Sequence, residues 1–156
     1  MRRYTLWLWI AVVVMLLNAT IHSLTLFISP APENPTEQQL MQLMQTYRPN
    51  LGPFFHPTTG NLVTALSSCF SLLCLLGALT NAYLLKKKAD AGLMKGFVGI
   101  NLLVFGICFG VMLVFTFLPP IILSGLIALF LLIAFITTPR PATVEGHLPI
   151  VSAAQN

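Results

Sequence analysis

Long apolar runs separated by short polar breaks dominate the chain. Four runs, at residues 4–28, 62–85, 97–118 and 121–137, contain no Asp, Glu, Lys or Arg. A transmembrane helix needs about 20 mostly apolar residues, because each residue adds about 1.5 Å along the helix. The pattern therefore predicts an all-α, polytopic membrane protein, with a four-transmembrane-helix bundle in a single membrane domain at residues 1–138.

The short break between the last two runs indicates two separate helices. If Gly96 to Thr137 formed one helix, it would measure about 60 Å, twice the hydrocarbon core of roughly 30 Å. Pro119 and Pro120 lie between the runs and disfavour a continuous helix. The sequence therefore predicts a tight helical hairpin here.

The one sizeable polar segment is residues 29–60, which we expect to form an external loop. Asn34, Pro35 and Glu37 have the order of a helix start, with a capping amide, a first-turn proline and a glutamate three residues after the cap. A short amphipathic helix from Pro35 to Tyr47 is predicted to follow. Its apolar face comprises Leu40, Leu43, Met44 and Tyr47. We expect this helix to lie on the bundle mouth or at the membrane interface.

The two ends of the chain have different patterns. Met1-Arg2-Arg3 before the first run fits a signal peptide, but the run is long and lacks a convincing cleavage site, so we interpret it as an uncleaved first helix. Residues 139–156 contain three prolines and few large apolar side chains, and we expect a flexible cytoplasmic tail.

Composition supports membrane residence. Hydrophobic residues make up 56% of the chain and charged residues 8%, against roughly 25% charged in soluble domains. The net charge of +4 does not indicate nucleic-acid binding, because the basic residues lie at the ends of apolar runs. On the four-span pattern one side of the membrane carries seven of them, and the other side carries Arg48. The seven are Arg2, Arg3, Lys86, Lys87, Lys88, Lys95 and Arg140. The positive-inside rule then predicts that both termini are cytoplasmic.

Polar side chains gather in the outer halves of the first two predicted spans. On the first, Asn18, His22 and Thr25 fall within an arc of about 60° at roughly 100° per residue. On the second, a similar stripe comprises Asn61, Thr64 and Ser68. Polar groups are costly in hydrocarbon, so we expect the two stripes to face each other. They predict an outward-opening polar pocket, covered by the short loop helix, with these six residues as candidate ligand-binding groups.

Two functions fit such a pocket. The favoured hypothesis is a non-enzymatic protein that packs with a membrane partner or binds a lipid-like ligand in the outer leaflet. The alternative is a small intramembrane enzyme or a redox subunit that binds haem or a quinone through His22. The competing structural interpretation is that the polar groups form interhelical hydrogen bonds, worth about 0.6 kcal/mol each, that fix packing.

Other residue types argue against further chemistry. No acidic residue lies in a predicted span, no motif indicates a catalytic residue, and the three scattered histidines do not indicate a metal site or a required cofactor. Cys69, Cys74 and Cys108 are interpreted as packing residues. The third span carries a glycine stripe, for which we expect packing inside the bundle, or alternatively in a homo-oligomer. The stripe includes Gly99, Gly106 and Gly110.

Taken together, these features resemble those of small, uncharacterised bacterial four-helix inner-membrane proteins. The resemblance covers Tyr4 to Thr137 and rests on the histidine in the first span, the loop helix, the serine-rich second span and the Pro119-Pro120 break. It implies a four-span fold and placement as a multi-pass protein in a bacterial inner (plasma) membrane. It implies no activity and no catalytic residue.

Overall fold

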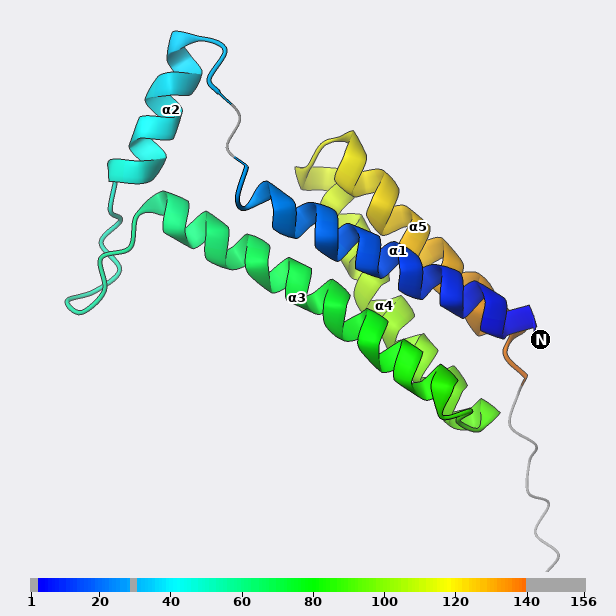
Figure 1. The fold of residues 1–156 in the computed structure, drawn as a ribbon. Coiled ribbons are helices and arrows are strands. Elements are labelled where there is room, and N and C mark those ends of the chain that lie inside the picture. The colour runs from blue at the N-terminus through cyan, green and yellow to red at the C-terminus, as the bar shows by residue number, and fades with distance from the viewer. Residues whose placement is uncertain (1–2, 29–30, 140–156) are drawn as a thin grey trace, which may run out of the picture.

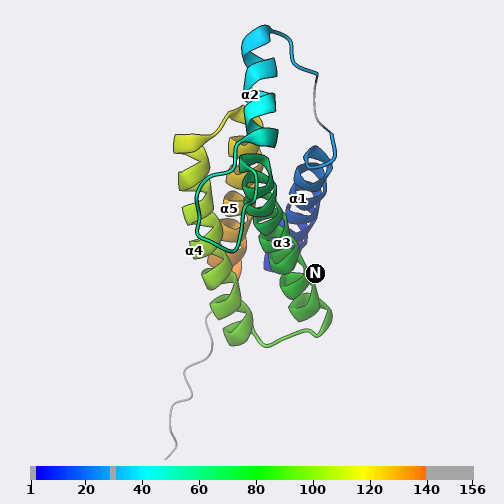
Figure 2. The ribbon, with the colours of Figure 1, turned by 90° about the vertical axis from the view of Figure 1, so that its left-hand side faces the viewer.

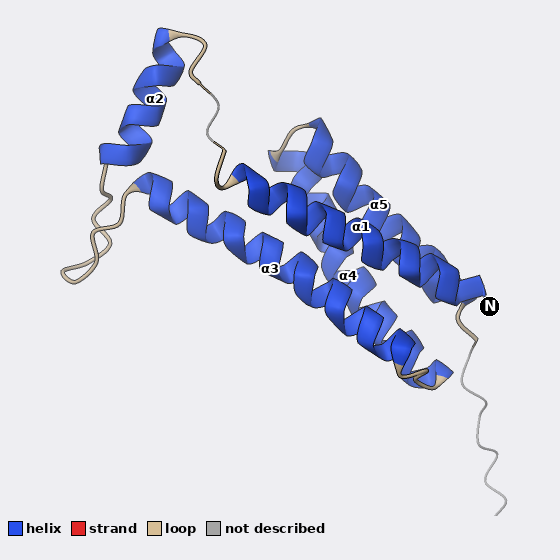
Figure 3. Ribbon diagram, in the orientation of Figure 1, coloured by secondary structure: helices blue, strands red, loops and turns tan. Residues whose placement is uncertain are grey.

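The computed structural model describes residues 3–28 and 31–139, and within them the fold is all-helical (Figures 1 and 3). The five helices are α1 (Arg3–Thr25), α2 (Pro35–Thr46), α3 (Thr59–Lys86), α4 (Ala91–Phe115) and α5 (Leu118–Thr137). All except α2 are long and apolar enough to cross a membrane. The predicted all-α class and the four long apolar helices are confirmed. The predicted tail lies outside the described residues from residue 140 onward.

The helix starts follow local capping chemistry. The Oδ1 atom of Asn34 accepts a hydrogen bond from the Glu37 backbone N–H at 2.9 Å, and the Glu37 carboxylate accepts one from the Glu33 N–H at 2.7 Å. The first bond satisfies a backbone donor that the first turn of α2 leaves without a partner, and the second ties the residue before the cap to that turn. The predicted start of the loop helix is therefore confirmed, and the helix ends at Thr46, one residue before the predicted end.

The long helices begin earlier or end earlier than the apolar runs suggest. At α4, the Asp90 carboxylate caps the backbone N–H groups of Gly92 and Leu93, which extends the helix six residues before the predicted start at residue 97. At α5, the helix begins at Leu118 and includes Pro119 and Pro120 in its first turn. Proline is tolerated there because first-turn N–H groups have no helical acceptor. The prolines thus lie inside the last helix, not between the two.

The arrangement centres on α1, which packs along α3 on one side and α5 on the other. Helix α4 packs mainly against α5 and makes only a few contacts with α3, although the two are consecutive in the chain. Figure 2 shows α4 at the far edge of the bundle from α1. Helix α2 stands apart, steeply inclined to α3, and its contacts are with α3 (Figure 1).

The core lies toward the end of the bundle where α1 begins. The largest fully buried side chains include Leu8 and Met15 of α1 and Phe105 of α4. Gly77 of α3 makes their close packing possible, since a Cβ there would lie 2.9 Å from Phe105 Cε2 and 3.3 Å from Met15 Sδ. One glycine thus lets three helices meet. Beyond Ala19 of α1, by contrast, the described side chains of that helix are exposed or only partly buried.

Candidate ligand-binding pocket

A pocket of about 480 Å³ lies where the end of α1, helix α2 and the start of α3 come together. One part of its wall is apolar, formed by Leu26, Ile28, Met41, Met44 and Val63. The other part is polar, formed by Gln45, Thr58, Asn61, Thr64 and Ser67, with Gly60 between them. None of these side chains ionises near neutral pH, so the pocket offers neutral hydroxyl and amide groups beside an apolar surface.

The end of α2 rests directly on the first turn of α3. A Cβ at Gly60 would lie 3.0 Å from the Met44 carbonyl oxygen, so a larger residue would push the helices apart. The Thr59 backbone N–H also donates to the Tyr47 carbonyl at 3.0 Å. Thr58 caps α3 by accepting from the Asn61 N–H at 3.2 Å. These contacts hold the α2 side of the pocket over its α3 side.

Two of the six predicted ligand-binding residues line this pocket. Asn61 and Thr64 lie one turn apart on α3, and both side chains are exposed. Ser68 is the next member of the stripe, but its hydroxyl donates to the Thr64 carbonyl at 2.8 Å and it does not line the pocket. Such a bond back to the helix satisfies the hydroxyl without a ligand.

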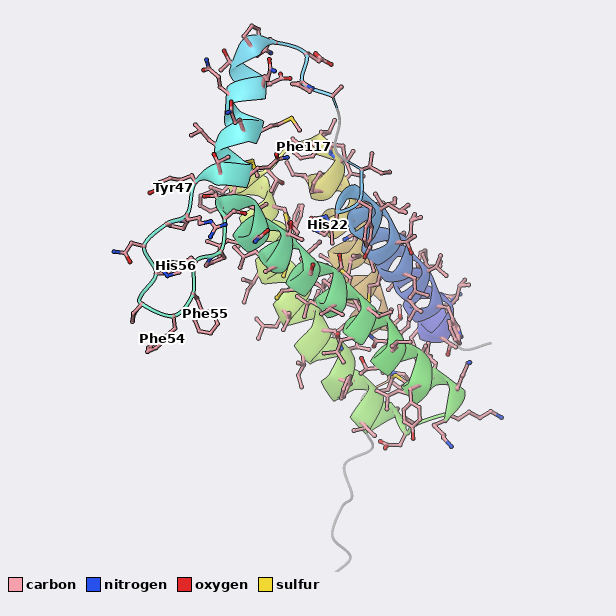
Figure 4. All side chains as sticks on the ribbon, turned by 60° about the vertical axis from the view of Figure 1, so that its left-hand side comes forward. His22, Tyr47, Phe54, Phe55, His56 and Phe117 are labelled. Atoms are coloured by element: carbon pink, nitrogen blue, oxygen red, sulfur yellow. The ribbon has the colours of Figure 1, made fainter. Side chains whose placement is uncertain are left out.

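Two of the three predicted residues of α1, Asn18 and His22, lie deeper, in the seam between α1 and α3. The buried Asn18 amide donates to Cys74 Sγ at 3.6 Å. The half-buried His22 ring meets Phe70 edge to face, with ring centroids 5.2 Å apart, and Figure 4 shows it on the outer part of α1. Thr25 belongs to the last turn of α1, and its side chain is outside the described part of the structure.

The two described members of the first polar stripe lie opposite Cys74 and Phe70, so the two stripes are offset along the seam. Asn18 is opposite Cys74 and His22 is opposite Phe70, which fixes the register of the antiparallel helices α1 and α3. Extrapolated in the same register, Thr64 lies at the level of Ile28, beyond the end of α1. Helical spacing predicts which residues of one helix share a face, but it does not fix how far one helix is shifted along the other.

The predicted apolar face of α2 meets α3 only in part, through Met44. Leu40, Leu43 and Tyr47 are more than half exposed. Met41 and Met44 are partly buried and line the pocket together with Gln45. Met41, Met44 and Gln45 follow the three- and four-residue spacing of one helix face, and this spacing could have predicted the face that lines the pocket. Met44 belongs to the predicted face, whereas Met41 was missed because the leucines make a second apolar stripe on the same short helix.

The three glycines predicted to pack on α4 have different surroundings. A Cβ at Gly99 would lie 3.1 Å from Phe135 Cε2, so this glycine packs closely against α5. A Cβ at Gly106 or Gly110 would meet nothing within 4 Å. Packing inside the bundle was predicted for all three, and it is wrong for Gly106 and Gly110. The close approach in this part of α4 is made by Phe109, whose Cε2 would lie 3.0 Å from a Cβ at Gly125 of α5.

Within the described residues, no group of three His, Cys, Asp or Glu side chains is placed to hold a metal ion. The pocket can accept or donate neutral hydrogen bonds and can cover an apolar chain, but its lining offers no group to shuttle a proton. No protein-family model, curated protein or solved structure matches the chain.

Proposed function

We propose that the protein is a non-enzymatic multi-pass membrane protein that binds a lipid-like amphiphile between α1, α2 and α3. The observation that carries this proposal is the divided lining of the 480 Å³ pocket. Hydroxyl and amide groups of α3 suit a neutral hydrogen-bonding headgroup, while Met41 and Met44 suit an acyl or prenyl chain. Methionine adapts its shape to irregular apolar ligands, which favours this ligand class.

The proposal includes an orientation and a location. With both termini cytoplasmic in a bacterial inner membrane, the lysine-rich turn after α3 faces the cytoplasm and the pocket opens at the outer leaflet. The support is the distribution of Lys and Arg, since positive charge is retained on the cytoplasmic side. The ligand would then come from the lipids around the protein. Labelling of single cysteines placed at Gln42 and Ala89, in a cysteine-free background, should occur from opposite sides of the membrane.

The ligand proposal is tested by lipid retention. The protein is reconstituted with phosphatidylethanolamine and phosphatidylglycerol, extracted in mild detergent and analysed by native mass spectrometry. We expect a bound amphiphile in the wild type and its loss when Asn61→Leu and Thr64→Val are combined. Thr137→Val is the matched control, because Thr137 is an exposed threonine at the opposite end of the bundle that bonds to its own helix. Equal retention in all three proteins would overturn the proposal.

The alternative function uses His22. The His22 ring contacts Phe70 edge to face, and His22 does not line the pocket. A haem or quinone subunit therefore stays a prediction, for which a Soret band lost in His22→Ala would be the supporting result. The other version of the main hypothesis, packing with a membrane partner or a second copy, would give a stable complex in place of a bound lipid.

A further inference from the structure

The segment between α2 and α3 is a closed loop. The Tyr47 carbonyl accepts hydrogen bonds from the Thr59 backbone N–H at 3.0 Å and from the Thr59 hydroxyl at 3.5 Å. These bonds hold the two ends of the loop at residues 48–58 close together. Gly52 has a φ of 119°, a conformation that other residues rarely adopt, and it turns the chain within the loop. The loop has the length and the close ends of a compact Ω-loop.

The tip of this loop presents large apolar side chains to the outside. Phe54 is 87% exposed, Phe55 is 76% exposed and Leu51 is 58% exposed. Two adjacent phenylalanines and a leucine without cover in water are unfavourable, since each would gain free energy by leaving water. Large apolar side chains exposed together on a closed loop are typical of a surface that binds something.

The position of the loop indicates what lies beneath the tip. In Figures 1 and 2 the loop lies beside the first turns of α3, on the side away from α2. Figure 4 shows Phe54 and Phe55 at the edge of the loop farthest from α2. Helix α3 is long and apolar enough to cross a membrane, and its first turns carry polar Thr59 and Asn61. The tip therefore overhangs the lipid that surrounds the start of α3.

The charge of the loop suits a phospholipid surface. Arg48 and His56 are the titratable side chains in residues 48–58, and there is no Asp or Glu there. Both acidic residues of the external segment, Glu33 just before the cap of α2 and Glu37 in its first turn, lie at the other end of the segment. Phosphate groups of lipids thus meet a positively charged loop, with Arg48 able to donate to them.

We propose that Leu51, Phe54 and Phe55 insert into the headgroup region of the leaflet that α3 enters, and so anchor the loop to the membrane surface. Aromatic side chains are enriched at this depth because their rings find an apolar environment close to water. The anchor holds α3's first turn at a fixed depth and keeps the end of α2 beside it. None of the three side chains lines the pocket, so the inference is independent of the proposed ligand.

Fluorescence quenching tests the insertion. Trp7 and Trp9 are replaced by Phe, and Phe55→Trp supplies the single reporter in the full chain. The protein is reconstituted in phosphatidylcholine vesicles whose acyl chains are brominated near their upper ends. We expect at least about a twofold loss of fluorescence relative to unbrominated vesicles, since interfacial aromatics lie within contact of that depth. Gln39→Trp on exposed α2 is the water-facing control, and Leu72→Trp on the exposed middle of α3 is the lipid-facing control.

The possible results distinguish whether lipid, water or protein surrounds the tip of the loop. Strong quenching of Phe55→Trp, with little quenching of Gln39→Trp, supports insertion. If Phe55→Trp is quenched no more than Gln39→Trp and remains open to acrylamide, the tip stays in water and the inference is overturned. If it is shielded from both quenchers, the tip is covered by protein, and a protein partner or a second copy replaces the lipid surface as its occupant.

Discussion

The two ends of the bundle are built differently. At the end where α1 begins, Leu8, Met15 and Phe105 are almost wholly buried and three helices meet at Gly77. At the other end, residues 59–70 of α3 include no buried side chain, and a pocket replaces the core. The difference indicates that stability and binding are separated along the same helices. Substitutions can test this separation, because each end should respond to a different measurement.

Phe105→Ala should cause the largest loss of stability. The Phe105 side chain is 1% exposed and fills the space beside Gly77 and Met15. We expect a loss of about 3 kcal/mol in the free energy of unfolding, the lower part of the range for Phe→Ala, because lipid solvates the freed apolar surface. The measurement is unfolding by sodium dodecyl sulfate in mixed micelles, followed by the fluorescence of Trp7, which stacks on Phe130 of α5.

Phe115→Ala is the matched control on the same helix. Phe115 is 79% exposed, so its removal should change the free energy of unfolding by less than about 0.5 kcal/mol. Equal losses in the two variants would show that the packed end does not dominate stability.

Gly77→Ala should have the next largest effect. The added methyl would clash with the Phe105 ring and crowd Met15, and overpacking of this kind costs about 1–3 kcal/mol. Gly106→Ala adds the same methyl where nothing lies within 4 Å. It should leave stability unchanged or raise it, because alanine favours helix over glycine. Thermal unfolding in detergent distinguishes the two, and similar melting temperatures would contradict the close approach at Gly77.

The seam between α1 and α3 should give a smaller effect. The Asn18 amide donates to Cys74 Sγ, and interhelical hydrogen bonds in membranes are worth about 0.6 kcal/mol. Asn18→Ala and Cys74→Ala, made singly and together, should show a coupling energy of about this size. Asn61→Ala paired with Cys74→Ala is the control, and it should show no coupling because Asn61 lies at the pocket. Additive losses for the first pair would argue against the bond.

Thr64→Val should have the smallest effect on stability. Its side chain is exposed and lines the pocket, so we expect a change in the free energy of unfolding within about 0.5 kcal/mol. Retention of the bound amphiphile should nevertheless fall, because the valine offers no hydroxyl. A large loss of stability without a change in lipid retention would contradict the separation, because the pocket end would then contribute to stability and not to binding.

Much of the fold could be predicted from local signals. The uncharged apolar runs gave the long helices, and Asn34 with Glu37 gave the start of α2. These features depend on residues near one another in the chain. The early starts of α4 and α5 were missed because the apolar runs were used as boundaries, whereas Asp90 and the two prolines act at the first turn of a helix.

The site was harder to predict because it depends on contacts between distant residues. Asn61 and Thr64 share a face by simple spacing, and both line the pocket. The register that puts His22 against Phe70 is set by how Met15, Gly77 and Phe105 fit together, and helical periodicity does not contain that information. The same holds for α2, where two apolar stripes compete and tertiary contact selects Met41 and Met44.

The central position of α1 has a consequence for biogenesis. Helix α1 leaves the ribosome before the other four described helices, yet its two main neighbours are α3 and α5, the last helix of the described bundle. Helices α1 and α3 can associate as soon as Lys86 has been synthesised. Helix α4, with few contacts to α3, gains its main neighbour only when α5 follows. Nascent chains that stop before Leu118 should therefore contain a paired α1 and α3 and an unanchored α4, a species that membrane quality-control proteases would recognise.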